Sequence, residues 1–264
     1  MLRLYTKKME LILSVLLLGI ILLGIGIYYV INFQDEYIPT EYEKELIEYF
    51  KEVVLESEYY ERPMRVVKWQ RPMILFVSKE KKYVDQMKAI EKTVANINEL
   101  VVDGFEIKLT DDLSKSNAVL YLGTLDRVAE LAPDFYQYMD DDIIDEDFSG
   151  FTYVEFEWSN YTILKASIFI EIEDSLEVQK STILEEITQS IGIPNDSEKY
   201  LNSIFYQHQI ENGIINKEYS KMDIDIIKLL YHPKMKPGLN SKECEKAIKR
   251  ILKKSHKKES YSEK

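Results

Sequence analysis

Our fold prediction for this chain starts from the sequence 185-EEITQSIGIPND-196. Apolar residues in and just before it recur at helical spacing and form one stripe, made of Ile183, Leu184, Ile187 and Ile191. Polar residues project from the opposite side, namely Thr182, Glu185, Glu186 and Gln189. Gly192 followed by Pro194 is a typical helix stop. Residues 175–196 therefore predict one amphipathic helix that carries two carboxylates and an amide on its non-core face.

The segments before this helix predict a sheet of mixed direction. Met73–Val77 is a continuous apolar run, which is typical of a strand buried on both faces. A helical pattern and a further strand follow it, and such a crossover makes the sheet at least partly parallel. The fold class is therefore α/β (α+β). The expected elements are helix 40–56, strand 73–77, helix 79–100, strands 105–109 and 118–122, a hairpin of 151–158 with 164–172, the helix of 175–196, and helix 222–231.

The helix spacing resembles that of metzincin-type zinc peptidases. These carry H-E-x-x-H-x-x-G-x-x-H, in which three imidazoles bind the metal and the glutamate is the general base. On that frame the ligand positions, the base and the glycine turn fall on Glu185, Gln189, Asn195, Glu186 and Gly192. With L-L-Y-x-P-x-x-x-P-G at 229–238, the pattern E-E-x-x-Q-x-x-G-x-x-N-D is similar to an uncharacterised bacterial family of domains of unknown function, whose fold is related to those peptidases.

The resemblance covers residues 41–239 and implies a fold more than an activity. It implies one metzincin-like domain over 32–240, with a mixed, mostly parallel sheet and an antiparallel edge strand that precedes the motif helix. All three imidazoles are replaced in this chain. The resemblance therefore implies a zincin fold in a pseudoenzyme.

The run from Leu11 to Ile31 is almost entirely apolar. A helix of that length spans about 30 Å, the thickness of a bilayer's hydrocarbon core. Basic residues precede it and acidic residues follow it, so the positive-inside rule places the N-terminus in the cytoplasm. A cleaved signal peptide is the alternative, but the run is too long for one. We predict a single-pass cell-membrane protein: 1–10 cytoplasmic, 11–31 transmembrane, 32–240 an extracytoplasmic domain and 241–264 a basic C-terminal tail.

Composition narrows the classes of partner. The net charge of -12 excludes a nucleic-acid partner, because phosphate binding needs a basic surface. A single cysteine, Cys244, excludes an internal disulfide.

The acidic segment 134–147 is expected to be a solvated loop, with a cation site as the alternative. The tail 241–264 is either a solvated tail or a basic amphipathic helix on anionic lipid or wall polymer.

The chemistry of the polar helix face argues against a conventional peptidase. Glu185, Gln189 and Asn195 offer hard oxygen ligands, which suit calcium, magnesium or manganese better than zinc. Without a metal, Glu186 must deprotonate water of pKa near 15.7 instead of bound water near 7, a gap of about 11 kcal/mol. General-base catalysis contributes about 3–5 kcal/mol. We therefore expect no cofactor, with a divalent metal as the alternative.

The sequence is compatible with two functions of different classes, a binding module and an enzyme. In the first, the fold binds a peptide, a protein or a cell-envelope polymer without cutting it, by strand addition along 151–158 with Tyr153, Glu155 and Glu157 as the partner-binding residues. In the second, the domain is an atypical metal-dependent hydrolase with Glu186 as the base. A plainly structural reading stays open as well: Glu185 and Gln189 hydrogen-bond the 194–196 loop.

Overall fold

The computed structural model describes residues 13, 15–24, 37–56, 63–139, 148–209 and 212–262. The chain divides into two units, Met1–Ile38 and Pro39–Lys264. In the first unit, residues 13 and 15–24 are helical and their side chains are exposed. The second unit holds the sheet, the remaining helices and the motif region.

The first unit corrects the predicted transmembrane helix. Among the described residues, no helix has both the length and the apolar content that a membrane span requires. The other residues of the expected span, except 13, lie outside the described ones. The transmembrane part of the fold class, the membrane partner and the single-pass location with an extracytoplasmic main domain were therefore wrong.

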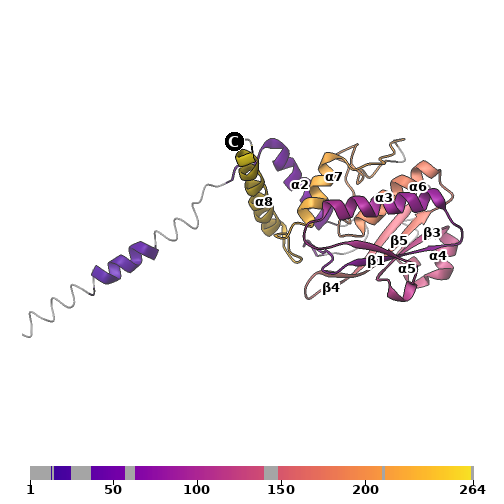
Figure 1. Ribbon diagram of the computed structural model, residues 1–264, viewed down its shortest axis with the longest axis horizontal. Coiled ribbons are helices and arrows are strands. Elements are labelled where there is room, and N and C mark those ends of the chain that lie inside the picture. The colour runs from indigo at the N-terminus through magenta and orange to yellow at the C-terminus, as the bar shows by residue number, and fades with distance from the viewer. Residues whose placement is uncertain are drawn as a thin grey trace, which may run out of the picture. The chain divides into compact units, whose positions relative to one another are not determined.

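The predicted mixed sheet is confirmed. It has five strands in the order β2-β1-β3-β5-β4 (Figure 1). The first three pairings in this order are parallel, whereas β4 and β5 form an antiparallel hairpin. An antiparallel strand, β4, therefore lies at one edge of a mostly parallel sheet. The strands are β1 (Met73–Lys79), β2 (Ile107–Thr110), β3 (Ala118–Gly123), β4 (Gly150–Glu157) and β5 (Thr162–Glu171).

Helices cover both faces of the sheet. In Figure 1, α3 and α6 lie along one face, and α4 and α5 lie on the other. Alternation along β5 explains this, because Ile168 and Ile170 enter the main core while Phe169 enters a smaller cluster with Val128 of α4 and Phe135 of α5. These helices are α3 (Val84–Leu100), α4 (Leu125–Leu131), α5 (Pro133–Tyr136) and α6 (Leu176–Gln189), with a short 3-10 turn η1 (Leu113–Lys115) between β2 and β3.

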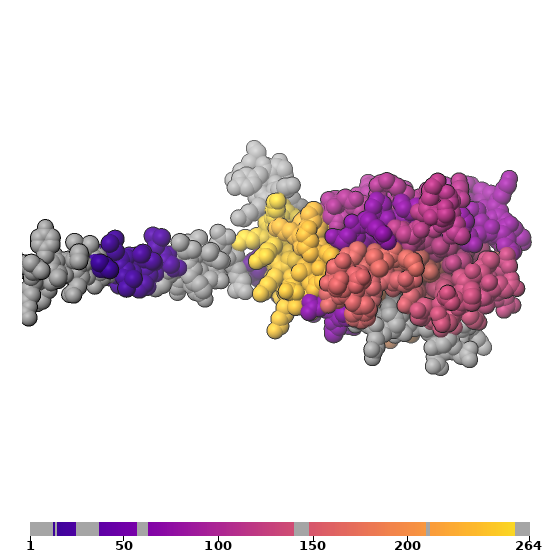
Figure 2. All heavy atoms as spheres, turned by 90° about the horizontal axis from the view of Figure 1, so that it is seen from below, coloured from indigo at the N-terminus to yellow at the C-terminus, as the bar shows by residue number. Residues whose placement is uncertain are grey.

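Three further helices complete the second unit: α2 (Glu41–Leu55), α7 (Lys221–Leu230) and α8 (Ser241–Ser262). Thr40 and Glu43 form a capping box at the start of α2, in agreement with the helix expected over 40–56. The basic C-terminal segment is a helix, α8, in yellow in Figure 2. Its apolar residues Cys244, Ile248 and Ile251 are buried in the main core. The face that we weighed as a lipid-binding surface thus packs inside the protein.

Candidate functional site

The outer edge of β4 is the first candidate site, and two hydrogen bonds fix its backbone geometry. The amide of Ala166 in β5 donates to the carbonyl of Asn117 beside β3, at 3.2 Å. The amide of Glu171 donates the other way, to the carbonyl of Ser149 beside β4, at 2.8 Å. Backbone groups alternate in direction along a strand. The even-numbered residues of β5 between these two points therefore face β3, and the odd-numbered ones face β4.

The register transfers this alternation to β4. Thr152 lies opposite Ile168, and Val154 lies opposite Ala166. Because these β5 residues face β3, the backbone N–H and C=O groups of Thr152 and Val154 point away from β5. No other strand in the described part of the chain pairs with β4 on that side. This edge presents an extended row of backbone donors and acceptors.

Side chains that we predicted as partner-binding lie along the same strand. The ring of Tyr153 is stacked on that of Tyr138, with 3.9 Å between centroids and an interplanar angle of 12°. The carboxylate of Glu155 lies 3.3 Å from the ammonium of Lys165 on β5. Glu155 and Glu157 are exposed and two residues apart. The edge strand therefore combines an aromatic pair with two exposed carboxylates.

Glu186 does not lie on an open face of α6, in contrast to the sequence expectation. It is buried, at 6% exposure, because β4 packs directly over it. A Cβ added at Gly150 would lie 2.4 Å from Thr182 Cγ2 and 2.9 Å from Glu186 Cγ. The hydroxyl of Thr152 donates to the backbone carbonyl of Glu186 at 2.9 Å. The first residue of β4 must be glycine for the strand and the helix to approach this closely.

The three ligand-equivalent residues make hydrogen bonds within the protein. Gln189 Nε2 donates to Asp196 Oδ1 at 2.9 Å, and Asn195 Nδ2 donates to the carbonyl of Asp196 at 2.8 Å. Glu185 Oε2 accepts from Gln209 Nε2 at 3.2 Å. The interpretation that the helix face hydrogen-bonds the 194–196 loop thus holds for Gln189, whereas Glu185 contacts a residue of a different loop. Within the described residues, no group of three or more His, Cys, Asp or Glu side chains is arranged to hold a metal ion.

A buried lysine, which sequence reasoning missed, holds the 229–238 pattern in place. Lys68 Nζ donates to Asp103 Oδ2 at 2.6 Å and to the carbonyl of Leu230 at 2.7 Å, and it lies 4.4 Å from the centre of the Tyr231 ring. Burial lowers the pKa of Lys68. The hydroxyl of Tyr231 donates to the carbonyl of Ile191, at 2.8 Å, in the turn after α6. The 229–238 pattern, which contributes to the family resemblance, therefore has a structural role.

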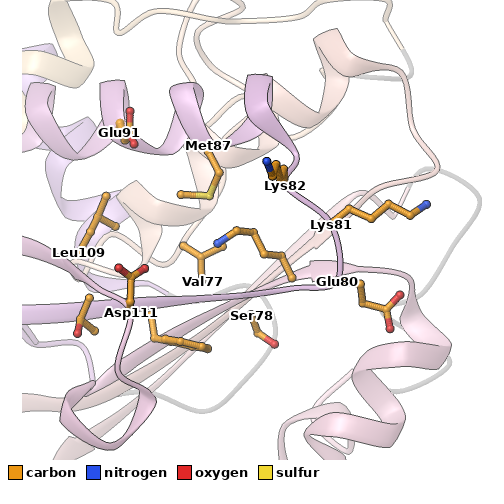
Figure 3. Close-up of a pocket in the computed structure, with 12 residues that line it drawn as sticks. Val77, Ser78, Glu80, Lys81, Lys82, Met87, Glu91, Leu109 and Asp111 are labelled. Carbon is orange, nitrogen blue, oxygen red and sulfur yellow. The ribbon is translucent and has the colours of Figure 1, made fainter.

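A second candidate site is a cavity of about 740 Å³ beyond the end of β2, between β1 and α3 (Figure 3). It exists because β2 ends at Thr110, opposite Phe76, while β1 continues to Lys79. The last residues of β1 therefore have β3 on one side and the cavity on the other. In Figure 3, Met87 of α3 lies above Val77 of β1. This site was not predictable from the sequence, because it depends on the unequal lengths of β1 and β2.

One protein-family model matches the chain. The family is DUF2927, described as a protein of unknown function, and the match covers residues 43–250. These residues include most of α2, helices α3 to α7, the whole sheet and the first part of α8. No curated protein matches this sequence.

Proposed function

We propose a non-catalytic, peptide-binding role for this chain, which belongs to the DUF2927 family of proteins of unknown function. An extended peptide adds to the outer edge of β4 and continues the sheet by one strand. Backbone hydrogen bonds provide the affinity, and side chains that alternate between the two faces provide the selectivity. The observation that carries this proposal is the outward direction of the backbone groups of Thr152 and Val154.

The charge of the edge selects a cationic peptide. Glu155 and Glu157 project from the strand two residues apart, and both are exposed. A lysine or arginine at every second position of an added strand meets both carboxylates on one face. The net charge of -12 also attracts cationic partners over longer distances. The ligand class is therefore an extended peptide with alternating basic residues.

The relationship to metzincin-type domains is part of this proposal. The antiparallel edge strand implied by the resemblance lies next to the last parallel strand, and the motif helix α6 follows that strand. Gly192 has the positive φ, 114°, that a glycine turn uses. One carboxylate, Glu185, and two amides replace the imidazoles, and the amides of Gln189 and Asn195 donate to Asp196, so the arrangement supports scaffold use rather than hydrolysis.

Fluorescence anisotropy with labelled octapeptides tests the proposal. We expect an alternating Lys-Val peptide to bind, and a Glu-Val peptide of the same length to bind at least tenfold more weakly. N-methylation of every second peptide residue removes the backbone donors of one edge. We therefore expect one N-methyl register to abolish binding and the other to preserve it. Equal loss in both registers would contradict strand addition.

Charge reversal on the protein gives the matched control. Glu155→Lys with Glu157→Lys should weaken Lys-Val binding about tenfold or more, because two attractive cross-strand pairs become repulsive. Glu41→Lys with Glu48→Lys on α2 makes the same change in net charge at exposed positions. This control pair should have a much smaller effect. Cleavage of the peptide that disappears in Glu186→Gln would instead support the hydrolase alternative.

A further inference from the structure

The cavity between β1 and α3 carries side chains of opposite charge toward its two ends. Figure 3 shows Glu91 and Asp111 toward one end, and Lys81 and Lys82, together with Glu80, toward the other. Lys79 belongs to the same lining. The two ends are separated by apolar side chains, Val77 and Met87 among them. The cavity is therefore cationic at one end, apolar in the middle and anionic at the other end.

The lysines at this cavity differ from most others in the protein. Lys79, Lys81 and Lys82 form no ion pair among the residues that the structure describes, whereas thirteen other lysines do. The loop's own acid, Glu80, is paired with Arg127 at 2.7 Å. No described carboxylate therefore forms an ion pair with these three ammonium groups. Lys81 extends outward in Figure 3, and its flexible four-carbon stem permits it to turn toward the cavity.

The position and size of the cavity suit a small molecule. It opens at the carboxyl-end side of a parallel sheet, where ligands of α/β proteins bind. Its volume, about 740 Å³, lies within the range of about 300–1,000 Å³ that is usual for ligand pockets. Lysine ammonium groups bind phosphate as point charges. Carboxylates such as Glu91 and Asp111 accept hydrogen bonds from hydroxyl groups.

We propose that this cavity binds a phosphate monoester with a hydroxyl-bearing body, such as a nucleoside monophosphate or a sugar phosphate. Lys79, Lys81 and Lys82 hold the phosphate. Glu91 and Asp111 accept hydrogen bonds from hydroxyls at the other end, and Val77 and Met87 contact the body between them. This site is independent of the β4 edge, so either proposal can fail without the other.

Isothermal titration of the full chain with AMP and with glucose 6-phosphate tests the proposal. We expect at least one of them to bind at millimolar or tighter affinity. Adenosine, glucose and inorganic phosphate should each bind at least tenfold more weakly than the corresponding ester. Absence of binding by both esters at 10 mM would overturn the proposal. Equal binding of inorganic phosphate would also overturn it, because the body would then contribute nothing.

Two variants and a matched control locate the site. Lys79→Ala with Lys82→Ala should weaken ester binding at least tenfold, and Glu91→Gln with Asp111→Asn should weaken it about threefold or more. All four side chains are exposed, so we expect the variants to keep the fold. Lys115→Ala, an exposed lysine on η1, should leave binding unchanged. Unchanged affinity in both cavity variants would overturn the assignment.

Discussion

Replacement of Gly192 by alanine tests how closely the turn after α6 approaches the segment before β1. A Cβ at position 192 would lie 2.2 Å from the carbonyl oxygen of Val67, which is far inside van der Waals contact. The backbone there has φ of 114°, outside the region that alanine favours. The neighbouring segment cannot easily move away, because Trp69 Nε1 donates to the carbonyl of Ser190 at 3.0 Å. Two costs therefore act together in Gly192→Ala.

Their sum gives the expected magnitude. The left-handed conformation costs roughly 1–2 kcal/mol for a residue with a Cβ, and overpacking costs roughly 1–3 kcal/mol. We expect Gly192→Ala to lower the free energy of unfolding by about 2–5 kcal/mol. Urea denaturation followed by circular dichroism measures this change. In a domain of this size it corresponds to a fall in Tm of about 4–20 °C.

Gly104→Ala provides the matched control. Gly104 also has a positive φ, 94°, but its added Cβ would meet nothing within 4 Å. It should therefore lose only the conformational part, about 1–2 kcal/mol. The difference between the two variants isolates the contact with Val67. If Gly192→Ala loses no more than Gly104→Ala, the close approach that we describe is refuted.

Three further predictions concern buried and paired groups. Lys68→Ala should lower the free energy of unfolding, measured by urea denaturation, by about 3–5 kcal/mol, because it leaves Asp103 without its buried cation. Lys68→Met with Asp103→Leu should recover much of this loss. A loss below about 1 kcal/mol for Lys68→Ala, as at an exposed site, would contradict the prediction. Burial raises the pKa of Cys244 to about 12 from 9.0. At pH 8 the thiol of the native protein should therefore react with a disulfide reagent about a thousandfold more slowly than the thiol of the protein unfolded in urea. Equal rates would show that the thiol is accessible in the native protein. Hydrogen bonds from Lys249 and Lys51 lower the pKa of Glu245 to about 2 from 4.5, so the stability that Glu245 contributes is present above pH 4.5 and is lost as the pH falls toward 2. The difference in the free energy of unfolding between wild type and Glu245→Gln, at most about 1 kcal/mol at pH 7, should vanish over that interval. A difference that stays constant with pH would argue against the ion pairs.

Local signals in the sequence predicted the elements that local contacts stabilise. The capping box at Thr40 fixed the start of α2, and the glycine at 192 fixed the end of the motif helix region. The hairpin of β4 and β5 was predicted at 151–158 with 164–172, close to its observed bounds. The start of α3 was predicted too early, at residue 79 instead of 84. The reason is that Lys79 still belongs to β1 and that Tyr83 has a left-handed backbone, φ 39°, just before the helix.

The burial of Glu186 was not predictable from helical periodicity. Periodicity separates two faces of an isolated helix, and it assigns the polar one to solvent. In the structure, α6 lies between the main core and β4, so both of its faces are covered near Gly150. Lys68 escaped prediction for a similar reason. Its partners at residues 103, 230 and 235 are far away in the sequence, and no spacing rule connects them.

The contact between α2 and α8 has a consequence for biosynthesis. Lys51 of α2 bonds Glu245 of α8 at 2.9 Å, and Ile248 and Ile251 complete the core that Leu46 and Phe50 begin. The ribosome makes the partner of α2 nearly two hundred residues later. A nascent chain therefore carries an unsatisfied apolar surface on α2 throughout most of its translation. A stop codon that removes α8 would leave that surface permanently open to chaperones and proteases, even though every residue of the sheet is present.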